Sequence, residues 1–196
     1  MNQRIILLGP ILFGTVTTVM TILKYDFLRG LGWHPLRDPT FDWPSGLALG
    51  PYGIVMTFTF IASGLLMSLL AVRLHADLKP GTASTIGPAL LIVAGLALAG
   101  LAFTTDPTIR STPATLHGRL HDACFVLLGL TLMPSMIVLG KAFRDDPRWR
   151  SYGLYTWLTA ALAIPTFALK GAAFYIFLLA VLVWSESVAW KLVKNA

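Results

Sequence analysis

One short segment of the chain concentrates the side chains that could carry out proton-transfer chemistry. Residues 115–122 read Thr-Leu-His-Gly-Arg-Leu-His-Asp and place two imidazoles, a guanidinium and a carboxylate within less than two helical turns. The segment leads without a break into an apolar run, residues 123–140. Ionisable groups at the point where a helix enters hydrocarbon are costly unless they are paired or functional. This segment is therefore the first candidate for a site.

The spacing of the two histidines favours acid–base catalysis. His117 and His121 are four residues apart, so a helix places them on one face, which Cys124 continues. A histidine changes its charge near neutral pH and can serve as a general acid or base. We expect the catalytic residues to be His117, His121, Asp106 and Asp122, with one of the two carboxylates fixing the tautomer of a histidine.

Two other interpretations of the same residues remain open. In the first, His117 and His121 provide two ligands to a zinc ion and Asp106 or His34 provides the third. The pair lacks the adjacent glutamate of a His-Glu-x-x-His motif, so no cofactor is expected and zinc is the alternative. In the second, the segment is a polar helix cap, in which His and Asp side chains bond to loop backbone and Arg119 contacts lipid phosphate.

Further polar residues lie in the predicted loops beside this segment. We expect a substrate to be bound by charged and imidazole side chains of these loops and of the helix start, namely His34, Arg37, Asp38, Arg110 and Arg119. Ser45 and Ser111 lie in the same loops, but neither occupies the Gly-x-Ser-x-Gly motif that exposes a nucleophilic serine on a sharp turn. The sequence therefore predicts no serine nucleophile.

The composition is that of an integral membrane protein. Of 196 residues, 56% are hydrophobic and only 12% are charged, and the mean hydropathy is +0.72. A soluble domain carries about twice that charged fraction. The net charge of +6 comes from scattered basic residues without a basic stripe, so no nucleic-acid partner is expected. The single cysteine excludes an internal disulfide.

Six apolar runs are long enough to cross a bilayer as helices, because a span needs roughly 17–25 residues. We predict an all-α, polytopic membrane protein with a single six-helix domain over residues 1–196 and an ordered loop cap formed by residues 24–51. The third run carries small residues, Gly95, Ala99 and Ala102, that would let a neighbouring helix approach closely. The predicted spans are residues 5–23, 52–72, 86–103, 117–140, 152–169 and 171–190.

The distribution of basic residues predicts the orientation. Nine Lys and Arg residues lie on the side of the two termini and six on the side of the candidate site, so the termini are expected in the cytoplasm and the site outside it. Glu186 is the one acidic residue within an apolar run. It lies about one turn before a basic end, so we expect it to pair with Lys191 or Lys194.

Four short blocks together resemble the membrane-protein family catalogued as domain of unknown function 998. They are Leu-Arg-Asp-Pro at 36–39, Ala-Leu-Gly-Pro-Tyr-Gly at 48–53, Phe-Thr-Thr-Asp-Pro at 103–107 and the block at 115–122. The resemblance covers nearly the whole chain and includes the six-span layout. It implies the fold and the location of the site, and the family name implies no activity.

Two functions follow from these patterns. The first is a membrane-embedded enzyme that acts on a lipid-like or isoprenoid-like substrate by acid–base chemistry at a pocket open to the extracytoplasmic side. The second is a transporter, channel or lipid-binding accessory protein. The middle of the spans holds only Thr and Ser as polar residues, whereas ion-coupled transporters place ionisable groups there, which favours the enzyme. The expected partners are membrane lipid and a lipophilic small molecule, and the chain could form an oligomer.

Overall fold

Six helices of the chain are long and apolar enough to cross a membrane. The computed structural model describes residues 3–37, 43–107, 114–169 and 171–195, and all regular elements within these residues are helices. In chain order they are η1 (Gln3–Leu7), α1 (Leu8–Leu23), α2 (Tyr25–Gly30), η2 (Ser45–Ala48), α3 (Gly53–Asp77), α4 (Thr82–Gly100), α5 (Leu116–Asp145), α6 (Arg150–Leu169) and α7 (Ala173–Asn195). The predicted all-α, six-span architecture is confirmed.

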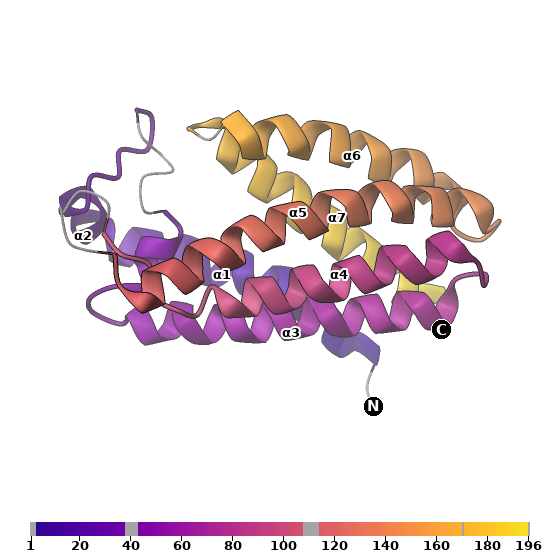
Figure 1. Ribbon diagram of the computed structural model, residues 1–196, viewed down its shortest axis with the longest axis horizontal. Coiled ribbons are helices and arrows are strands. Elements are labelled where there is room, and N and C mark those ends of the chain that lie inside the picture. Colours follow the sequence, from indigo (N-terminus) through magenta and orange to yellow (C-terminus); the bar gives the residue numbers. More distant parts are fainter. Residues whose placement is uncertain (1–2, 38–42, 108–113, 170, 196) are drawn as a thin grey trace.

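The six long helices form a ring in chain order. α1 packs on α3, α3 on α4, α4 on α5, α5 on α6 and α6 on α7, and α7 returns to α1 (Figure 1). We call the end with α2, η2 and the α4–α5 connection the cap end. Both chain termini lie toward the opposite end (Figure 1). Because the ring closes, apolar side chains from all six long helices meet at its centre.

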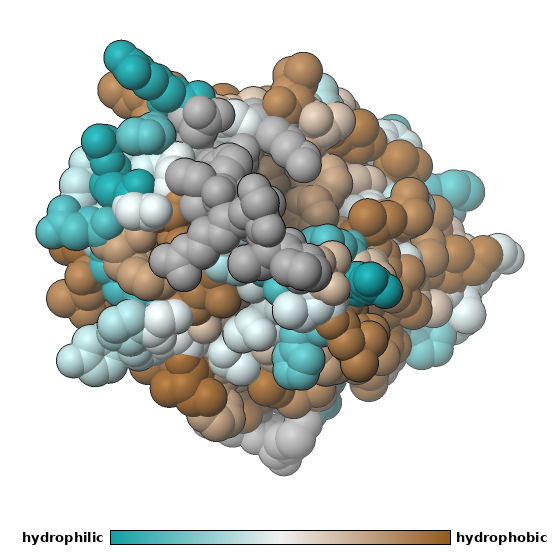
Figure 2. Space-filling model, turned by 60° about the vertical axis from the view of Figure 1, so that its left-hand side comes forward, coloured by the Kyte–Doolittle hydropathy of each residue, from teal (hydrophilic) through white to brown (hydrophobic). Residues whose placement is uncertain are grey.

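The outer surface of the ring is apolar along its length. Large aliphatic side chains such as Leu65, Leu130, Leu158 and Leu179 are exposed on α3, α5, α6 and α7. Figure 2 shows hydrophobic side chains over much of the surface, with hydrophilic side chains most frequent on the left of the view and scattered elsewhere. Such a surface is stable only when lipid covers it.

Helices α3 and α4 approach each other at backbone contact. A Cβ atom on Gly64 would fall on the carbonyl oxygen of Gly95 and the backbone of Ala99, and a Cβ on Gly95 would fall on Gly64 and Ser68. The Ser68 hydroxyl donates across the contact to the Ile92 carbonyl at 3.3 Å. Small residues thus hold this helix pair together, as predicted for Gly95 and Ala99.

Helix α4 begins at Thr82, four residues before the predicted span, because its polar first turn is stabilised locally. The Ser84 hydroxyl donates to the Lys79 and Gly81 carbonyls at 2.8 and 3.0 Å. Pro88 lies inside the helix and has no N–H to donate to the Ser84 carbonyl four residues earlier. The His75 ring supplies that bond instead, with its Nδ1 atom 2.8 Å from the Ser84 oxygen.

A polar network closes the end opposite the cap. Arg148 bridges Asp77 at 3.3 Å and Asp146 at 3.0 Å, and Trp149 donates its indole N–H to Asp77 at 2.7 Å. Burial opposes the charge of Asp146, but hydrogen bonds from the Arg148 side chain and from the backbone of Arg148 and Lys79 outweigh it and lower the pKa of the carboxyl group. The network therefore ties the α3–α4 turn to the α5–α6 turn.

The close α3–α4 contact predicts a large difference between two Gly→Ala substitutions. Gly64→Ala should destabilise the protein by about 1–3 kcal/mol, because the added methyl group meets backbone that cannot move aside. Gly14→Ala in α1 is the matched control, since its Cβ would meet only a Leu182 methyl at 3.5 Å and Ala is the better helix former. Thermal unfolding in detergent measures both, and equal melting temperatures would refute the contact.

Candidate functional site

The His121 imidazole is the buried polar centre of the cap end. Only 4% of the residue is exposed. Its Nδ1 atom lies 3.1 Å from the Leu101 carbonyl oxygen and 2.7 Å from that of Phe103. Carbonyl oxygens only accept hydrogen bonds, so this geometry assigns the proton of the neutral ring to Nδ1. The other ring nitrogen, Nε2, then has a free lone pair and accepts from the Ser45 hydroxyl at 2.9 Å.

The segment that carries Ser45 is anchored by a buried lysine. Lys24, 4% exposed, follows α1 and donates through its ammonium group to the Leu47 carbonyl at 3.0 Å and to the Leu49 carbonyl. The same ammonium lies 4.6 Å from the centre of the Phe27 ring. Burial lowers the pKa of Lys24, yet the two carbonyls and the ring compensate the charged form. Lys24 therefore fixes η2 against the end of α1.

A second anchor lies just before Ser45. The Trp43 indole N–H donates to the Thr21 hydroxyl at 2.9 Å, and the ring packs edge-on against Tyr175 with 5.0 Å between centroids. These contacts join the loop to α1 and α7, the first and the last of the six long helices, where the ring closes. Ser45 is thus placed by its neighbours, and its own hydroxyl is left to His121.

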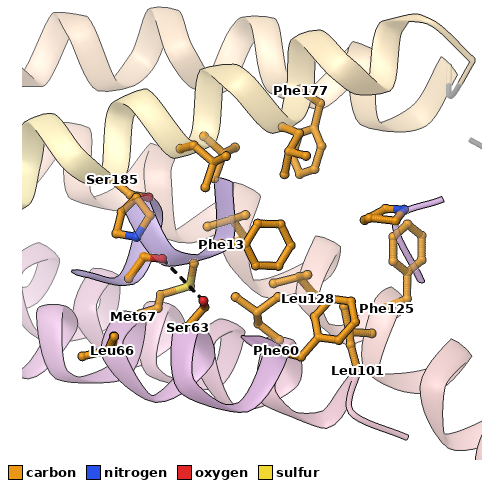
Figure 3. Close-up of a pocket in the computed structure, with 18 of the residues that line it drawn as sticks. Phe13, Phe60, Ser63, Leu66, Met67, Leu101, Phe125, Leu128, Phe177 and Ser185 are labelled. Carbon is orange, nitrogen blue, oxygen red and sulfur yellow. Dashed lines mark hydrogen bonds between the residues drawn. The ribbon is translucent and has the colours of Figure 1, made fainter. Parts of the chain in front are cut away.

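An apolar cavity of about 90 Å³ occupies the centre of the helix ring. Its lining comes from all six long helices and from Pro44 and Ser45 of the loop. Figure 3 shows that it is elongated, with Leu66, Met67 and Ser185 toward one end and Leu101 and Phe125 toward the other. Among the residues that the structure describes, the polar side chains in the lining are Ser45, Ser63 and Ser185. The lining is therefore apolar apart from these three hydroxyl groups.

Asp106 forms a helix cap and makes no hydrogen bond to a histidine within the described residues. Its carboxylate accepts from the Thr115 hydroxyl and from the Thr115 N–H, both at 2.7 Å. Thr115 in turn caps α5 by accepting from the Gly118 N–H at 3.0 Å. The hydroxyl bond, followed by the backbone bond, lowers the pKa of Asp106. Asp106 thus supports the start of α5, and two backbone carbonyls rather than a carboxylate contact Nδ1 of His121.

The two histidines do not share an environment, although they lie four residues apart on one helix. His117 is exposed and lies edge-on to Phe103 with 5.8 Å between ring centroids. Asp122 is exposed as well. In the described ranges no group of three or more His, Cys, Asp or Glu side chains is placed to hold a metal ion, so His117, His121 and Asp106 do not converge on a zinc position.

The expected substrate-binding residues are spread over the cap end. Arg37 and Arg119 are exposed and His34 is half-buried, whereas Asp38 and Arg110 lie outside the described residues. Glu186 does not form the expected ion pair. Its Oε2 atom is buried without a hydrogen-bond partner among the described residues, and Lys194 lies over the Trp190 ring at 5.2 Å.

Sequence reasoning missed Ser45 as the partner of His121. The two residues are 76 positions apart and no motif links them, so only the folded loop brings the hydroxyl to the imidazole. The neighbouring Trp43-Pro44-Ser45-Gly46 run gave a weak signal, because an aromatic residue and a proline indicated a loop that folds back onto the bundle.

Comparison with known proteins identifies the family. Residues 12–192 match the family described as protein of unknown function (DUF998), which is most of the chain, and the chain belongs to this family. No curated protein and no solved structure matches it. The resemblance of the four sequence blocks is thereby confirmed, and the function has to be argued from the site itself.

The Asp106 cap predicts a pH dependence of stability. Because the folded pKa of Asp106 is lowered, its bonds to Thr115 stabilise the fold above the ordinary carboxyl pKa of about 4 and are lost as the pH falls below it. Between pH 5 and about pH 3 the melting temperature of the wild type should fall more steeply than that of Asp106→Asn. Asp122→Asn, changed at an exposed carboxylate, should follow the wild type. Parallel curves for all three proteins would contradict the cap.

Proposed function

We propose that this member of the family is a membrane-embedded enzyme that acts on a lipophilic, lipid-like or isoprenoid-like substrate, with His121 as its general base and acid. One observation carries the proposal. The basic Nε2 atom of a buried, oriented histidine bonds to Ser45, and Ser45 lines an apolar cavity in the centre of the helix ring.

The surroundings of His121 suit proton transfer. A base that takes a proton at Nε2 becomes positive, and the Leu101 and Phe103 carbonyl oxygens face the opposite side of the ring at Nδ1. These dipoles stabilise the imidazolium and prevent rotation of the ring. The Ser45 hydroxyl that bonds to Nε2 belongs to a residue that lines the cavity, which would bring the base and a bound chain to the same end of the bundle.

The cavity suits a long hydrocarbon chain. Its lining is almost entirely aliphatic and aromatic, with Phe13, Phe60, Phe125 and Phe177 among its side chains (Figure 3). A substrate chain lying between these rings would present its polar group at the cap end, beside Ser45 and His121. The general rule that small-molecule sites combine apolar walls with a few convergent polar groups supports this placement.

A second candidate function is lipid binding or transport without catalysis, and the same cavity favours it. A bound chain between the helices requires no reaction, and the hydrogen bond between Ser45 and His121 would then only close the cap end. The two functions differ in whether a bound lipid is chemically changed.

The catalytic test is a comparison of two histidine substitutions. The purified protein is reconstituted into vesicles of total bacterial phospholipid, and lipid conversion is followed by mass spectrometry. His121→Gln should lower the conversion rate by about 10²–10⁴, the usual effect of removing a positioned acid or base, while Gln can still bond to the Leu101 and Phe103 carbonyls. His117→Gln should stay close to the wild type because His117 is exposed.

The opposite ranking, with His117→Gln inactive and His121→Gln active, would refute the assignment of the base. Lipid that copurifies with the wild type but is never converted would favour the binding function instead. Melting temperatures of the three proteins in detergent separate a loss of activity from a loss of folded protein.

We also propose that the cap end faces the outside of the cell and that both termini are cytoplasmic, because of the nine-to-six distribution of basic residues. Single cysteines at Leu36 and Lys141, both exposed and at opposite ends of the bundle, test it in a Cys124→Ser background. A membrane-impermeant maleimide should label position 36 in intact cells and position 141 only after permeabilisation. The reverse pattern would invert the topology.

A further inference from the structure

We infer that Ser45 is a nucleophile and that the substrate class is a long-chain carboxylic ester, so that the cap end carries a Ser–His acyl-transfer site. This inference rests on the proposed function, and it names the bond that is broken. It starts from the geometry of three groups. Ser45 donates to His121 Nε2 at 2.9 Å, and His121 Nδ1 faces the Leu101 and Phe103 carbonyl oxygens at 3.1 and 2.7 Å.

That order is nucleophile, base and orienting group, which is the arrangement that activates a serine hydroxyl. The orienting group here is a pair of backbone carbonyls in place of a carboxylate. The carbonyls belong to residues that follow α4, where the chain has left the helix and its oxygens are free of helical partners. The irregular segment after α4 therefore has a function in this scheme, which is to hold the histidine.

The Ser45 hydroxyl is not the only contact that holds the loop in place. Lys24 fixes η2 through the Leu47 and Leu49 carbonyls, and Trp43 fixes the preceding turn through Thr21. Ser45 itself is only partly buried and lines the cavity, whereas the residues that follow it, Gly46 to Ala48, are buried. A hydroxyl that is bonded to a base and open to an apolar cavity is placed for reaction with a bound chain.

The apolar lining of the cavity favours a hydrocarbon acyl chain as the part of the ester that is bound there. Next to Ser45 the lining continues as aliphatic and phenylalanine side chains from all six long helices, and none of the described residues adds a charged side chain to it. An acyl chain that enters this space would have its carbonyl carbon at the Ser45 end. A short acyl group would leave most of the lining unfilled and lose the hydrophobic free energy of the chain.

The reaction balances with water as the second substrate. The Ser45 oxygen bonds to the ester carbonyl carbon while its proton passes to His121 Nε2. The bond from that carbon to the alcohol oxygen then breaks, and the alcohol leaves with the proton from His121. A water molecule from the cap end gives a proton to His121 and attacks the acyl–Ser45 ester, which releases the carboxylic acid and restores the Ser45 hydroxyl.

The experiment uses decyl fluorophosphonate, whose phosphorus is attacked by an activated serine with loss of fluoride. The full-length protein in detergent should be labelled at Ser45, as located by peptide mass spectrometry. Ser45→Ala should give no label there, and His121→Gln should slow labelling by at least about 100-fold. Ser151→Ala, at an exposed serine at the opposite end, is the matched control and should label at the wild-type rate.

The dependence of the labelling rate on the length of the probe's alkyl chain is an independent test, because a hydrogen bond with a purely structural role would not produce it. Ethyl fluorophosphonate should label Ser45 at least about tenfold more slowly than the decyl probe, because it does not fill the cavity. Protein unfolded in dodecyl sulfate should show no label with either probe.

Three results would overturn the inference: no label on the folded wild type, a label on a different serine, or equal labelling rates in wild type and His121→Gln. If lipid conversion nevertheless depends on His121, the proposed enzyme stands and only the covalent step fails. If Ser45→Ala remains fully active in conversion, the covalent step is excluded in the same way. Failure of the proposed function itself is recognised separately, by conversion that is the same in wild type and His121→Gln.

Discussion

The cap end depends on one buried imidazole. His121 lies on α5, contacts the chain just after α4 through Nδ1, and contacts the loop between α2 and α3 through Nε2. An imidazole buried in an apolar bundle must use both nitrogens in hydrogen bonds, because an unsatisfied buried polar atom costs about 1–3 kcal/mol. This requirement fixes where α4 ends, where η2 sits and which tautomer the ring adopts. The candidate chemistry follows from that arrangement.

Different kinds of polar group hold the turns together at the two ends of the bundle. The opposite end joins its turns by Asp77, Asp146 and Arg148, where charges pair with one another. The cap end uses Lys24 and His121 on backbone carbonyls and a hydroxyl. Charge pairs hold a closed structure, whereas an imidazole whose Nε2 atom bonds to a hydroxyl can exchange a proton with that hydroxyl. This contrast is why the site is assigned to the cap end.

The fold was largely predictable from the sequence, because long apolar runs without charges can only be stable as membrane helices. Its boundaries were less predictable. The start of α4 at Thr82 depends on hydrogen bonds of Ser84 and on the His75 ring, which substitutes for the missing N–H of Pro88. Both contacts involve polar residues that hydropathy assigns to a loop. Small residues in α4 did predict a close helix contact, although Gly64 on α3 was not foreseen as the partner.

The candidate site was predictable in part. The position of His121 at the start of an apolar run singled it out as a candidate for a site, and its side chain is buried at the cap end. Helical spacing put His117 on the same face, but the bundle covers only the second of the two turns and leaves His117 exposed. Asp106 has a local partner in Thr115, which a pattern of residue types alone cannot distinguish from a catalytic carboxylate. Ser45 required the folded loop.

The central claim is that a substrate chain occupies the centre of the helix ring with its reactive carbon at Ser45. The most direct measurement is an experimental density map of the protein after reaction with decyl fluorophosphonate. We expect continuous density from the Ser45 oxygen into the cavity, between the rings of Phe60 and Phe177. Density for the decyl chain on the outer, lipid-facing surface, with an unmodified Ser45 still bonded to His121, would contradict it.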